Sequence, residues 1–303
     1  MGSHLTERLL ELGAEVSVLV RPRSVTGTVG SDFRNLGPVA RKLHHVFATD
    51  VAGPDAEAAI TDLCPSVIFH LAADAYVERS FSHPREVLRT NMDGTMTVLE
   101  AARRSPAIDR VVVTSSSEVY GPAQAERMTE DHPLQPTSPY AASKVAADRM
   151  AMAYHRTYGT PVSIIRPFNT YGPRHVYDVI PKFIARALAG EPLLVFGDGQ
   201  QSRDFTYVDD MVAAFLCMGA HPDALGQVVH FGSGQATSIA ALAEAVASAV
   251  GGEVRIESAP ARAAEVARLC CDAARAASLL GWTPQTSLSE GLVRNVAWMR
   301  ERV

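Results

Sequence analysis

The chain has 303 residues, of which 47% are hydrophobic and 20% are charged. This length suits one large α/β domain or two smaller ones around a substantial core. The net charge of −5 argues against a nucleic-acid-binding protein, because neutralising phosphates needs a basic face. No apolar run approaches the roughly 20 residues that span a bilayer, and no signal-peptide stretch follows Met1. The four cysteines lack metal-ligand spacing. We therefore expect a cytoplasmic, reduced protein without a metal site.

The first half of the chain alternates short apolar runs, typical of strands, with amphipathic helical stretches. Leucines at 5, 9 and 12 share one face of a first helix. The sequence then predicts strands at about 15–20, 43–47, 67–72, 110–114 and 162–165, and helices at about 84–104 and 138–158. Strands that alternate with helices form right-handed βαβ units. The predicted fold class is therefore α/β, with a doubly wound, Rossmann-like parallel sheet.

After residue 167 the pattern changes to shorter elements separated by turns rich in glycine and proline. This change predicts a smaller C-terminal lobe that binds the substrate. We expect a dinucleotide-binding domain over 1–168, with a return segment at about 203–232, and a substrate-binding lobe that is mainly 169–303.

The predicted first helix is the one that normally follows a glycine-rich turn. A doubly wound dinucleotide-binding fold has a first strand that leads into such a turn. Gly2 looks like the last glycine of that turn, so we expect a native strand and glycine-rich loop ahead of it. The alternative is that Met1-Gly-Ser-His4 is the remnant of an expression tag.

The strongest chemical signal is Tyr140-Ala-Ala-Ser-Lys144. Ser138 is a predicted N-cap and Pro139 suits the first helical position. Tyr140 and Lys144 then lie on one face of the helix. A lysine and a helix N-terminus both favour a phenolate, so the tyrosine can act as a base. The alternative is an ordinary surface pair, since this spacing also arises by chance.

A strand that opens into a polar loop precedes this helix, and it reads Val111-Val-Val-Thr-Ser-Ser-Ser-Glu-Val-Tyr-Gly121. With this loop and the tyrosine helix, the chain resembles the extended short-chain dehydrogenase/reductases that act on nucleotide sugars. The resemblance covers essentially the whole chain after Gly2. It implies that Ser116 is the catalytic hydroxyl, hydrogen-bonded to the sugar C4 oxygen beside Tyr140.

The resemblance also implies a nicotinamide cofactor. The turn Val20-Arg-Pro-Arg-Ser24 is similar to the arginine-rich turn of GDP-mannose dehydratases that bind NADP, and guanidinium groups suit a 2′-phosphate. NADP is therefore the favoured cofactor, and NAD is the alternative. The arginines could also be ordinary solvated loop residues with no role in binding. Asp50 matches the acceptor for the adenine amino group. The residues that the resemblance assigns to the cofactor are Gly2, Arg21, Arg23, Ser24, Asp50, Val51, Leu71, Ala72, Ala73, Asn91, Tyr140 and Lys144.

Two later segments, Arg166–Pro173 and Gly197–Tyr207, are similar to those that bind a nucleotide-diphosphate sugar in the family. They place Asn169 and Arg203 on phosphates and apolar residues on the base. The implied substrate-binding residues are Ser116, Asn169, Ile180, Val195, Phe196, Arg203 and Arg262.

The residues Ser116, Ser117 and Glu118 bear on the reaction. Glu118 occupies the position at which 4,6-dehydratases carry the base that removes the C5 proton, and Ser117 matches GDP-mannose- and UDP-sugar-type dehydratases. Ser116 is instead typical of 4-epimerases, whereas dehydratases carry threonine there. We predict an NDP-sugar 4,6-dehydratase, which oxidises C4, eliminates water across C5 and C6, and returns hydride to C6. An NDP-sugar 4-epimerase is the alternative, and a catalytically impaired homologue that serves as a structural partner is a further one.

The helices at about 84–104 and 138–158 resemble those that pair into a four-helix dimer interface in this family. Both carry more apolar residues than one sheet-facing stripe requires. These residues are Val87, Leu88, Met92, Val98, Leu99, Val145, Met150 and Met152. We expect a homodimer that binds a nucleotide-diphosphate sugar and has no nucleic-acid or membrane partner.

Overall fold

The computed structural model describes residues 1–21, 35–261 and 266–302. They fold into two compact units that interleave in sequence. Unit 1 comprises 1–119, 136–166 and 212–229, and unit 2 comprises 120–135, 167–211 and 230–303. The segment that returns to unit 1 is thus 212–229, which lies inside the predicted return segment of about 203–232 but is shorter at both ends.

Unit 1 contains two parallel sheets. In the larger one the strand order is β3-β4-β5-β9, and in the smaller one β1 pairs with β2. Helices connect the parallel strands of the larger sheet, and β9 joins it after a long excursion of the chain. This arrangement confirms the predicted α/β, Rossmann-like architecture. The elements are α1 (Gly2–Glu11), β1 (Val18–Val20), η1 (Gly37–Lys42), β2 (Val46–Ala48), α2 (Pro54–Leu63), β3 (Val67–His70), α3 (Val77–Ser82), α4 (Pro84–Leu88), η2 (Arg89–Asp93), α5 (Gly94–Arg104), β4 (Arg110–Thr114), η3 (Ser117–Tyr120), α6 (Pro139–Tyr158), β5 (Val162–Pro167), the larger part of α8 (Val208–Ala220), η4 (Pro222–Ala224) and the start of β9 (Val228–Phe231).

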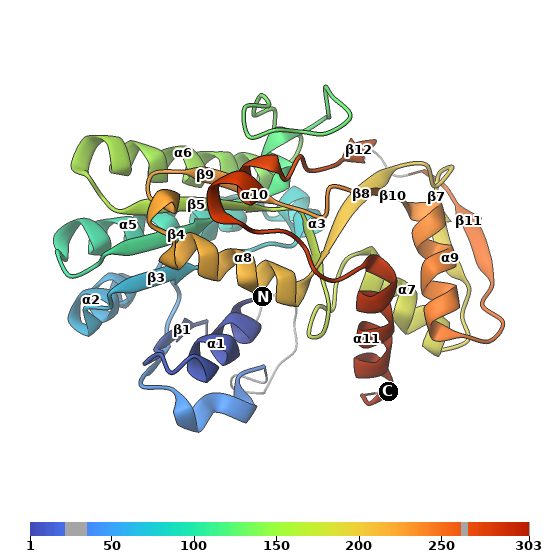
Figure 1. Ribbon diagram of the computed structural model, residues 1–303, viewed down its shortest axis with the longest axis horizontal. Coiled ribbons are helices and arrows are strands. Elements are labelled where there is room, and N and C mark those ends of the chain that lie inside the picture. The colour runs from blue at the N-terminus through green and yellow to red at the C-terminus, as the bar shows by residue number, and fades with distance from the viewer. Residues whose placement is uncertain (22–34, 262–265, 303) are drawn as a thin grey trace. The chain divides into compact units, whose positions relative to one another are not determined.

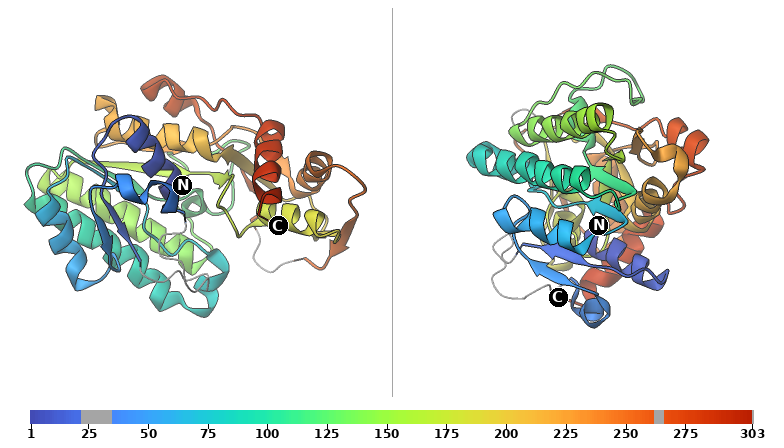
Figure 2. Two further views of the ribbon diagram at one scale, coloured as in Figure 1. Left: turned by 90° about the horizontal axis from the view of Figure 1, so that it is seen from below. Right: turned by 90° about the vertical axis from the view of Figure 1, so that its left-hand side faces the viewer.

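Helices cover both faces of the larger sheet. On one face, Val111 and Val113 of β4 belong to a core cluster with Leu99 of α5, and α5 and α6 lie side by side there (Figures 1 and 2). On the other face, Phe69 of β3 approaches α8 so closely that a Cβ added to Gly219 would lie 2.5 Å from its ring. Successive residues of a strand point to opposite faces, so the middle of β4, Val111–Val113, is apolar on both.

The helix predicted at about 84–104 is confirmed, and it contains a π-helical turn that the sequence did not indicate. A short α4 leads into a π-helical turn, η2, and α5 follows from Gly94. A Cβ at residue 94 would lie 2.5 Å from Cγ1 of Val51, so glycine permits the close approach of α5 to the loop after β2. π-Helical turns are frequent at functional sites.

The helix predicted at 138–158 is confirmed as α6. The Ser138 hydroxyl oxygen accepts a hydrogen bond from the amide of Ala141 at 3.1 Å, and Pro139 takes the first helical position. Gly159 ends the helix in the left-handed conformation, with φ at 70°. Both ends of α6 are therefore fixed by local sequence.

Unit 2 is built around the central strand β8. This strand lies between β10 and β12 and also pairs in parallel with β6, while β7 pairs with β11. Its apolar core joins α7, α9 and α11 through Ile184, Leu242, Val246 and Leu292, all nearly inaccessible. The elements are the end of β9, β6 (Asn169–Tyr171), α7 (Val179–Leu188), β7 (Leu193–Phe196), β8 (Ser202–Tyr207), β10 (Ala236–Ser238), α9 (Ile239–Val250), β11 (Ile256–Ala259), β12 (Arg268–Leu269), α10 (Ala274–Leu280) and α11 (Leu288–Arg300).

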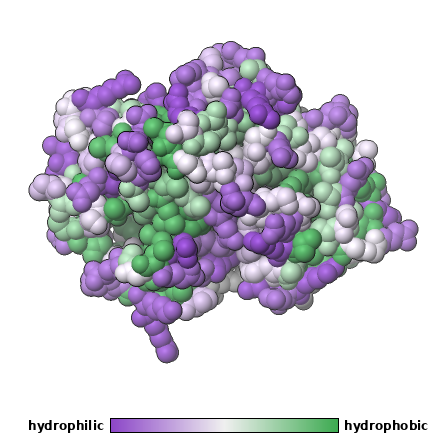
Figure 3. Space-filling model, viewed as in Figure 1, coloured by the Kyte–Doolittle hydropathy of each residue, from purple (hydrophilic) through white to green (hydrophobic). Residues whose placement is uncertain are grey.

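Among the described residues, none of the helices has the length and apolar character needed to cross a membrane. Apolar and hydrophilic residues alternate over the face seen in the space-filling view (Figure 3).

Candidate active site

The buried side chain of Lys144 links α6 to the end of β4. Its Nζ donates a hydrogen bond to the backbone carbonyl oxygen of Thr114 at 2.9 Å. Burial lowers the pKa of Lys144 to about 8, and the negative charge of Asp148 partly opposes this shift. Tyr140, one helical turn before Lys144, is also buried. The lysine and tyrosine singled out in the sequence are thus both drawn into unit 1 and are not a solvated surface pair.

The residues Ser116, Ser117 and Glu118 lie directly after β4. Ser116 and Ser117 are buried, whereas Glu118 is half-buried in the short helix η3. The Ser116 hydroxyl oxygen accepts a hydrogen bond from the amide of Glu118 at 3.2 Å, which tightens the turn. Its hydroxyl proton remains available to another acceptor, because the turn uses only a lone pair. The loop therefore holds a hydroxyl donor and a carboxylate two residues apart.

A buried pair of ionised groups supports α6 from below. Arg166, at the end of β5, donates from Nε to the Asp148 carboxylate at 2.8 Å and from Nη2 at 3.2 Å. Burial raises the pKa of Asp148, but the bonds and charge of Arg166 and the charge of Arg149 outweigh it, so the net shift is downward. Asp148 lies one turn after Lys144, so this pair fixes the helix that carries the candidate base.

Asn91 fastens the loop after β3 to α6. Its Oδ1 accepts from the Asp74 amide at 2.7 Å, and its Nδ2 donates to the Asp74 carbonyl at 3.2 Å and to the Ser143 hydroxyl at 2.8 Å. Both amide hydrogens are therefore used within the chain. The structure gives Asn91 a positioning role, and the cofactor contact assigned to it by resemblance stays a prediction.

His70, the last residue of β3, is a buried neutral group. Its Nε2 lies 3.0 Å from the Thr95 hydroxyl. Burial, and to a smaller extent the charge of Lys144, lower the pKa of His70 to about 3. The cofactor residues predicted after it, Leu71, Ala72 and Ala73, are half-buried and carry no ionisable side chain.

A polar pocket with a volume of about 220 Å³ lies in unit 1. Three arginines and two carboxylates line it together with one hydroxyl, and these residues are Arg21, Asp50, Arg79, Glu86, Arg89 and Thr90. Arg21 donates to the Thr90 hydroxyl at 3.0 Å, and Arg89 donates to the Asp50 carboxylate at 3.5 Å. Arg21 also lies 3.8 Å from that carboxylate.

The residues of this pocket fit the adenosine end of NAD(P). Arg79 is neutralised by Asp74 and Glu86, but Arg21 and Arg89 share the single carboxylate of Asp50. Two partly exposed guanidinium groups with one carboxylate between them leave donors for an anionic ligand. Of the other predicted cofactor residues, Gly2 is exposed at the start of α1, Val51 is buried against Gly94, and Arg23 and Ser24 lie outside the described residues.

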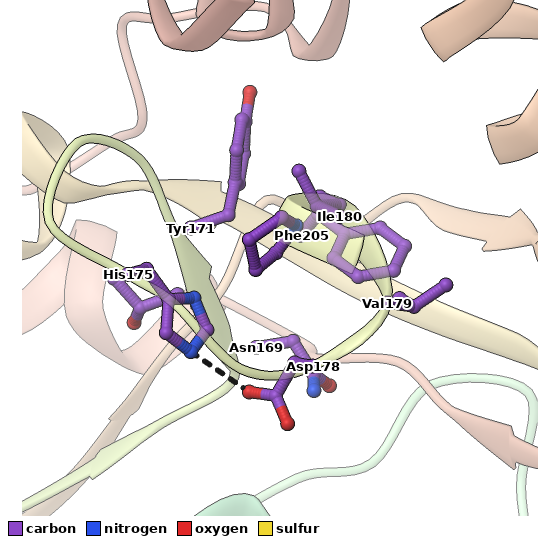
Figure 4. A pocket seen from close by; sticks show the side chains of 9 residues that line it. Asn169, Tyr171, His175, Asp178, Val179, Ile180 and Phe205 are labelled. Carbon is purple, nitrogen blue, oxygen red and sulfur yellow. Dashed lines mark ion pairs between the residues drawn. The ribbon is translucent and has the colours of Figure 1, made fainter. Parts of the chain in front are cut away.

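A second, smaller pocket lies in unit 2 between the end of β6 and the start of α7. Figure 4 shows His175 and Asp178 facing each other across one side of it, with Ile180 and Phe205 on another. Of the predicted substrate residues, this pocket contains Asn169 and Ile180.

Three further predicted substrate residues lie on β7 and β8, namely Val195, Phe196 and Arg203. Val195 is buried in the core, Phe196 is half-buried, and neither lines this pocket. Arg203 donates to the carbonyl of Ser202 at 2.8 Å and is half-buried on β8. Arg262 lies outside the described residues.

The residues predicted for a dimer interface divide into two groups. Val87, Val98, Leu99 and Met152 are buried within unit 1, so they pack on their own chain. Only the other four are accessible, with Leu88 exposed and Met92, Val145 and Met150 half-buried.

Sequence reasoning missed two sets of pocket residues. Arg79 on α3 pairs with Glu86 on α4, and Arg89 follows one turn later in η2, so the three residues meet through the packing of these short helices. His175 and Asp178 meet because Asp178 adopts a φ of 75° just before α7. Their spacing just after the Asn169 segment was the available clue.

Comparison with known proteins identifies the family. The GDP-mannose 4,6 dehydratase family matches residues 1–295. The chain belongs to this family. Its relatives include a UDP-glucose 4-epimerase of Mycolicibacterium smegmatis, 36% identical over 100% of this chain and 96% of the relative. A dTDP-glucose 4,6-dehydratase of Actinoplanes sp. is 36% identical over 77% of this chain and 73% of the relative.

Solved structures agree with this family over nearly the whole chain. The dTDP-glucose 4,6-dehydratase DesIV of Streptomyces venezuelae, solved with NAD bound, has a TM-score of 0.88 at 32% identity. The comparison covers 99% of this chain and 94% of DesIV. The epimerase Mth375 of Methanothermobacter thermautotrophicus has a TM-score of 0.91 at 28% identity, over 99% of this chain and 89% of that one. The chain is therefore an enzyme of the dehydratase and epimerase type.

Proposed function

We propose that the chain is a nucleotide-sugar 4,6-dehydratase that uses a nicotinamide cofactor. The observation that carries the proposal is the hydrogen bond between Lys144 and the carbonyl of Thr114, which fixes the Tyr140 helix to the strand that presents Ser116 and Glu118. Two adjoining elements thus supply the three groups: α6 carries the base, and the loop after β4 carries the hydroxyl donor and the carboxylate.

Tyr140 is proposed to take the proton of the sugar C4 hydroxyl. Lys144, with a pKa of about 8, carries its positive charge at neutral pH and favours the phenolate form of the tyrosine on the same helix face. Ser116 donates its free hydroxyl proton to the C4 oxygen. When bound, the nicotinamide ring accepts the C4 hydride and later returns it to the sugar.

Glu118 is proposed to act at C5. A 4-keto group acidifies the neighbouring C5–H, so a carboxylate of ordinary basicity can remove that proton. The C6 hydroxyl then leaves as water with the proton that Glu118 has taken, and a hydrogen bond from a side chain of the loop assists its departure. Ser117, buried beside Glu118, is the candidate donor. After hydride returns to C6, a proton from solvent completes C5. The product is a 4-keto-6-deoxy sugar.

NADP is the proposed form of the cofactor. The support is the pocket in which Arg21 and Arg89 flank Asp50, because paired guanidinium groups suit a 2′-phosphate. DesIV was solved with NAD, and NAD is the alternative for this chain. The assignment of Asp50 to the adenine amino group is retained as part of this proposal.

A 4-epimerase is the second candidate function. Ser116 is the residue that the family's epimerases carry at this position, and the Mycolicibacterium smegmatis relative with a match across the whole chain is a UDP-glucose 4-epimerase. In this case Glu118 has no proton to remove, and hydride returns to the opposite face of C4.

Mass spectrometry distinguishes these two functions. GDP-mannose, UDP-glucose and dTDP-glucose are incubated separately with the protein and NADP or NAD in heavy water. We expect one sugar to lose a molecule of water and to gain deuterium at C5. An unchanged sugar mass with inverted C4 would favour the epimerase. No change in any of the sugars would count against both.

We also propose a cytoplasmic homodimer, paired through α4, α5 and α6. Accessible apolar residues support it. They are Leu88 on α4, Met92 in η2, and Val145 and Met150 on α6.

A further inference from the structure

The small pocket of unit 2 contains two buried polar atoms that have no hydrogen-bond partner within the described part of the chain. They are Nδ1 of His175 and Oδ1 of Asn169. Buried polar atoms of folded proteins are nearly always hydrogen-bonded, so each such exception calls for an explanation. A ligand group that binds between them would supply the missing partner.

The ion pair with Asp178 determines what His175 can offer. Nε2 of His175 lies 3.0 Å from Oδ2 of Asp178, and the amide of His175 donates to the carbonyl of Gly172 at 3.3 Å (Figure 4). The carboxylate can only accept a hydrogen bond, so Nε2 of the imidazole carries a proton, and in the neutral form of the ring this is its only N–H. Nδ1 then carries a lone pair and is an acceptor.

Asn169 adds a second acceptor, because Oδ1 is the oxygen of its amide. The wall formed by Ile180 and Phe205 offers no polar side-chain group. The pocket therefore presents acceptors and apolar surface, together with the negative charge of Asp178. Such a lining suits a hydrogen-bond donor.

The size of the pocket agrees with this chemistry. Its volume is about 20 Å³, enough for about one group of the size of a water molecule. A hydroxyl group fits this space, whereas a phosphate group with its several oxygens does not. The phosphate contact predicted for Asn169 would use its Nδ2 donor and so does not compete for Oδ1.

We propose that His175, held by Asp178, is a specificity-determining residue that accepts a hydrogen bond from a hydroxyl group of the nucleotide sugar. The inference rests on the proposed function, because it takes a nucleotide sugar as the ligand. Asp178 is a positioning residue that fixes the imidazole tautomer.

Calorimetry with two variants tests the proposal. His175→Leu replaces the acceptor with an apolar side chain of similar size, whereas His175→Asn keeps an acceptor close to the position of Nδ1. Val176→Ala is the matched control, since Val176 is the neighbouring residue, is 66% exposed and does not line the pocket. Thermal melting of each variant shows whether it is folded.

The titrated ligands are GDP-mannose, UDP-glucose and dTDP-glucose. For a sugar that binds the wild type, we expect His175→Leu to weaken binding at least tenfold, with His175→Asn recovering most of it and Val176→Ala unchanged. In turnover, KM should rise by the same factor with kcat within twofold. Unchanged affinity of folded His175→Leu would overturn the inference and leave the proposed function intact. If no nucleotide sugar binds the wild type, the proposed function itself fails, and the inference with it.

Truncated ligands identify which hydroxyl is bound, shown here for the case in which UDP-glucose binds. A loss confined to UDP-glucose, with UDP unaffected, would assign the hexose. A loss shared by UDP-glucose and UDP but absent for dUDP would assign the ribose 2′-hydroxyl, and either result supports the proposal. An equal loss for these three ligands that is absent for 2′,3′-dideoxy-UDP would assign the ribose 3′-hydroxyl and also supports the proposal. An equal loss for all four ligands would indicate a contact with the phosphates or base and would overturn it.

Discussion

The ammonium group of Lys144 is bound to the backbone carbonyl of Thr114 at 2.9 Å, two residues before Ser116. Thr114 is the last residue of β4, so this bond gives a carbonyl at the end of the strand a donor. It also aligns α6 with the loop that carries Ser116 and Glu118. The lysine is buried in this position, which is why its pKa falls to about 8. The same contact therefore sets both the geometry and the charge of the candidate site.

Replacement of Tyr140 by phenylalanine should remove the base and little else. General base catalysis contributes about 10²–10⁴-fold, so we expect kcat to fall at least a hundredfold. The ring of Tyr140 is buried, and phenylalanine retains its packing, so the melting temperature should change by only a few degrees. Tyr158→Phe, at a side chain that is 58% exposed, is the control and should retain full activity. A folded Tyr140→Phe protein with normal turnover would exclude the assignment.

The pKa of Lys144 predicts a pH dependence of both rate and stability. If the ammonium form supports the phenolate, kcat should decline as the pH rises through about 8. Between pH about 8 and the ordinary pKa of 10.5, Lys144 of the unfolded chain holds a proton that Lys144 of the folded chain has lost. Stability that derives from this group therefore rises with pH in that window. Urea unfolding of wild type and Lys144→Met at pH 7.5 and 9.5 measures it. The free energy of unfolding of Lys144→Met should lack the increase between pH 7.5 and 9.5 that the wild type shows. An equal change in both proteins would contradict the expectation.

Local sequence was sufficient to predict α6 and most of the strands. Ser138 and Pro139 start α6 and Gly159 ends it, so its bounds depend only on neighbours in the chain. The apolar run Val111–Val113 is likewise buried on both faces, as a central parallel strand requires. These features carried the fold class and the placement of Tyr140 and Lys144.

Tertiary packing decided the features that the sequence did not reveal. The π-helical turn η2 leads into Gly94, whose close approach to Val51 joins two segments that lie far apart in the chain. The amide of Asn91 is bound to Asp74 and Ser143, a contact that depends on three separate segments meeting, whereas its contact with the cofactor stays a prediction. The pair of His175 and Asp178 includes a residue other than glycine with a positive φ, and the spacing of the two residues after the Asn169 segment was the only clue to it.

Arg21 and Arg89 are expected to decide the preference for NADP. A hydrogen bond to a charged group contributes about 1.5–3 kcal/mol, so each alanine variant should weaken NADP binding by about ten- to a hundredfold. NAD lacks the 2′-phosphate, and its affinity should change by less than threefold. Arg103→Ala is the control, since this arginine pairs with Glu100 on α5 and does not line the pocket. Calorimetry with both cofactors measures the ratio, and a parallel loss for NAD and NADP would refute 2′-phosphate recognition.

The dimer proposal depends on the exposed part of α4. Leu88 is 49% exposed there, so Leu88→Glu would place a charge in a four-helix interface and should shift the protein from dimer to monomer. Val293→Glu on α11, at a residue 56% exposed in unit 2, is the matched control and should leave the mass unchanged. Light scattering at micromolar concentration measures both. A wild-type protein with the mass of a monomer would count against the dimer.

Glu118→Gln separates the two candidate reactions. Glutamine keeps the size of the side chain but cannot accept the C5 proton, so a dehydratase should stop after oxidation at C4. The cofactor would then accumulate in its reduced form, which absorbs in the near ultraviolet, and product formation should fall at least a hundredfold. An epimerase never removes the C5 proton, so the same variant should turn over with little change and accumulate no reduced cofactor. Glu126→Gln, on an exposed carboxylate that pairs with Arg268 in unit 2, is the control. Normal turnover of Glu118→Gln, together with an unchanged sugar mass, would decide in favour of the 4-epimerase.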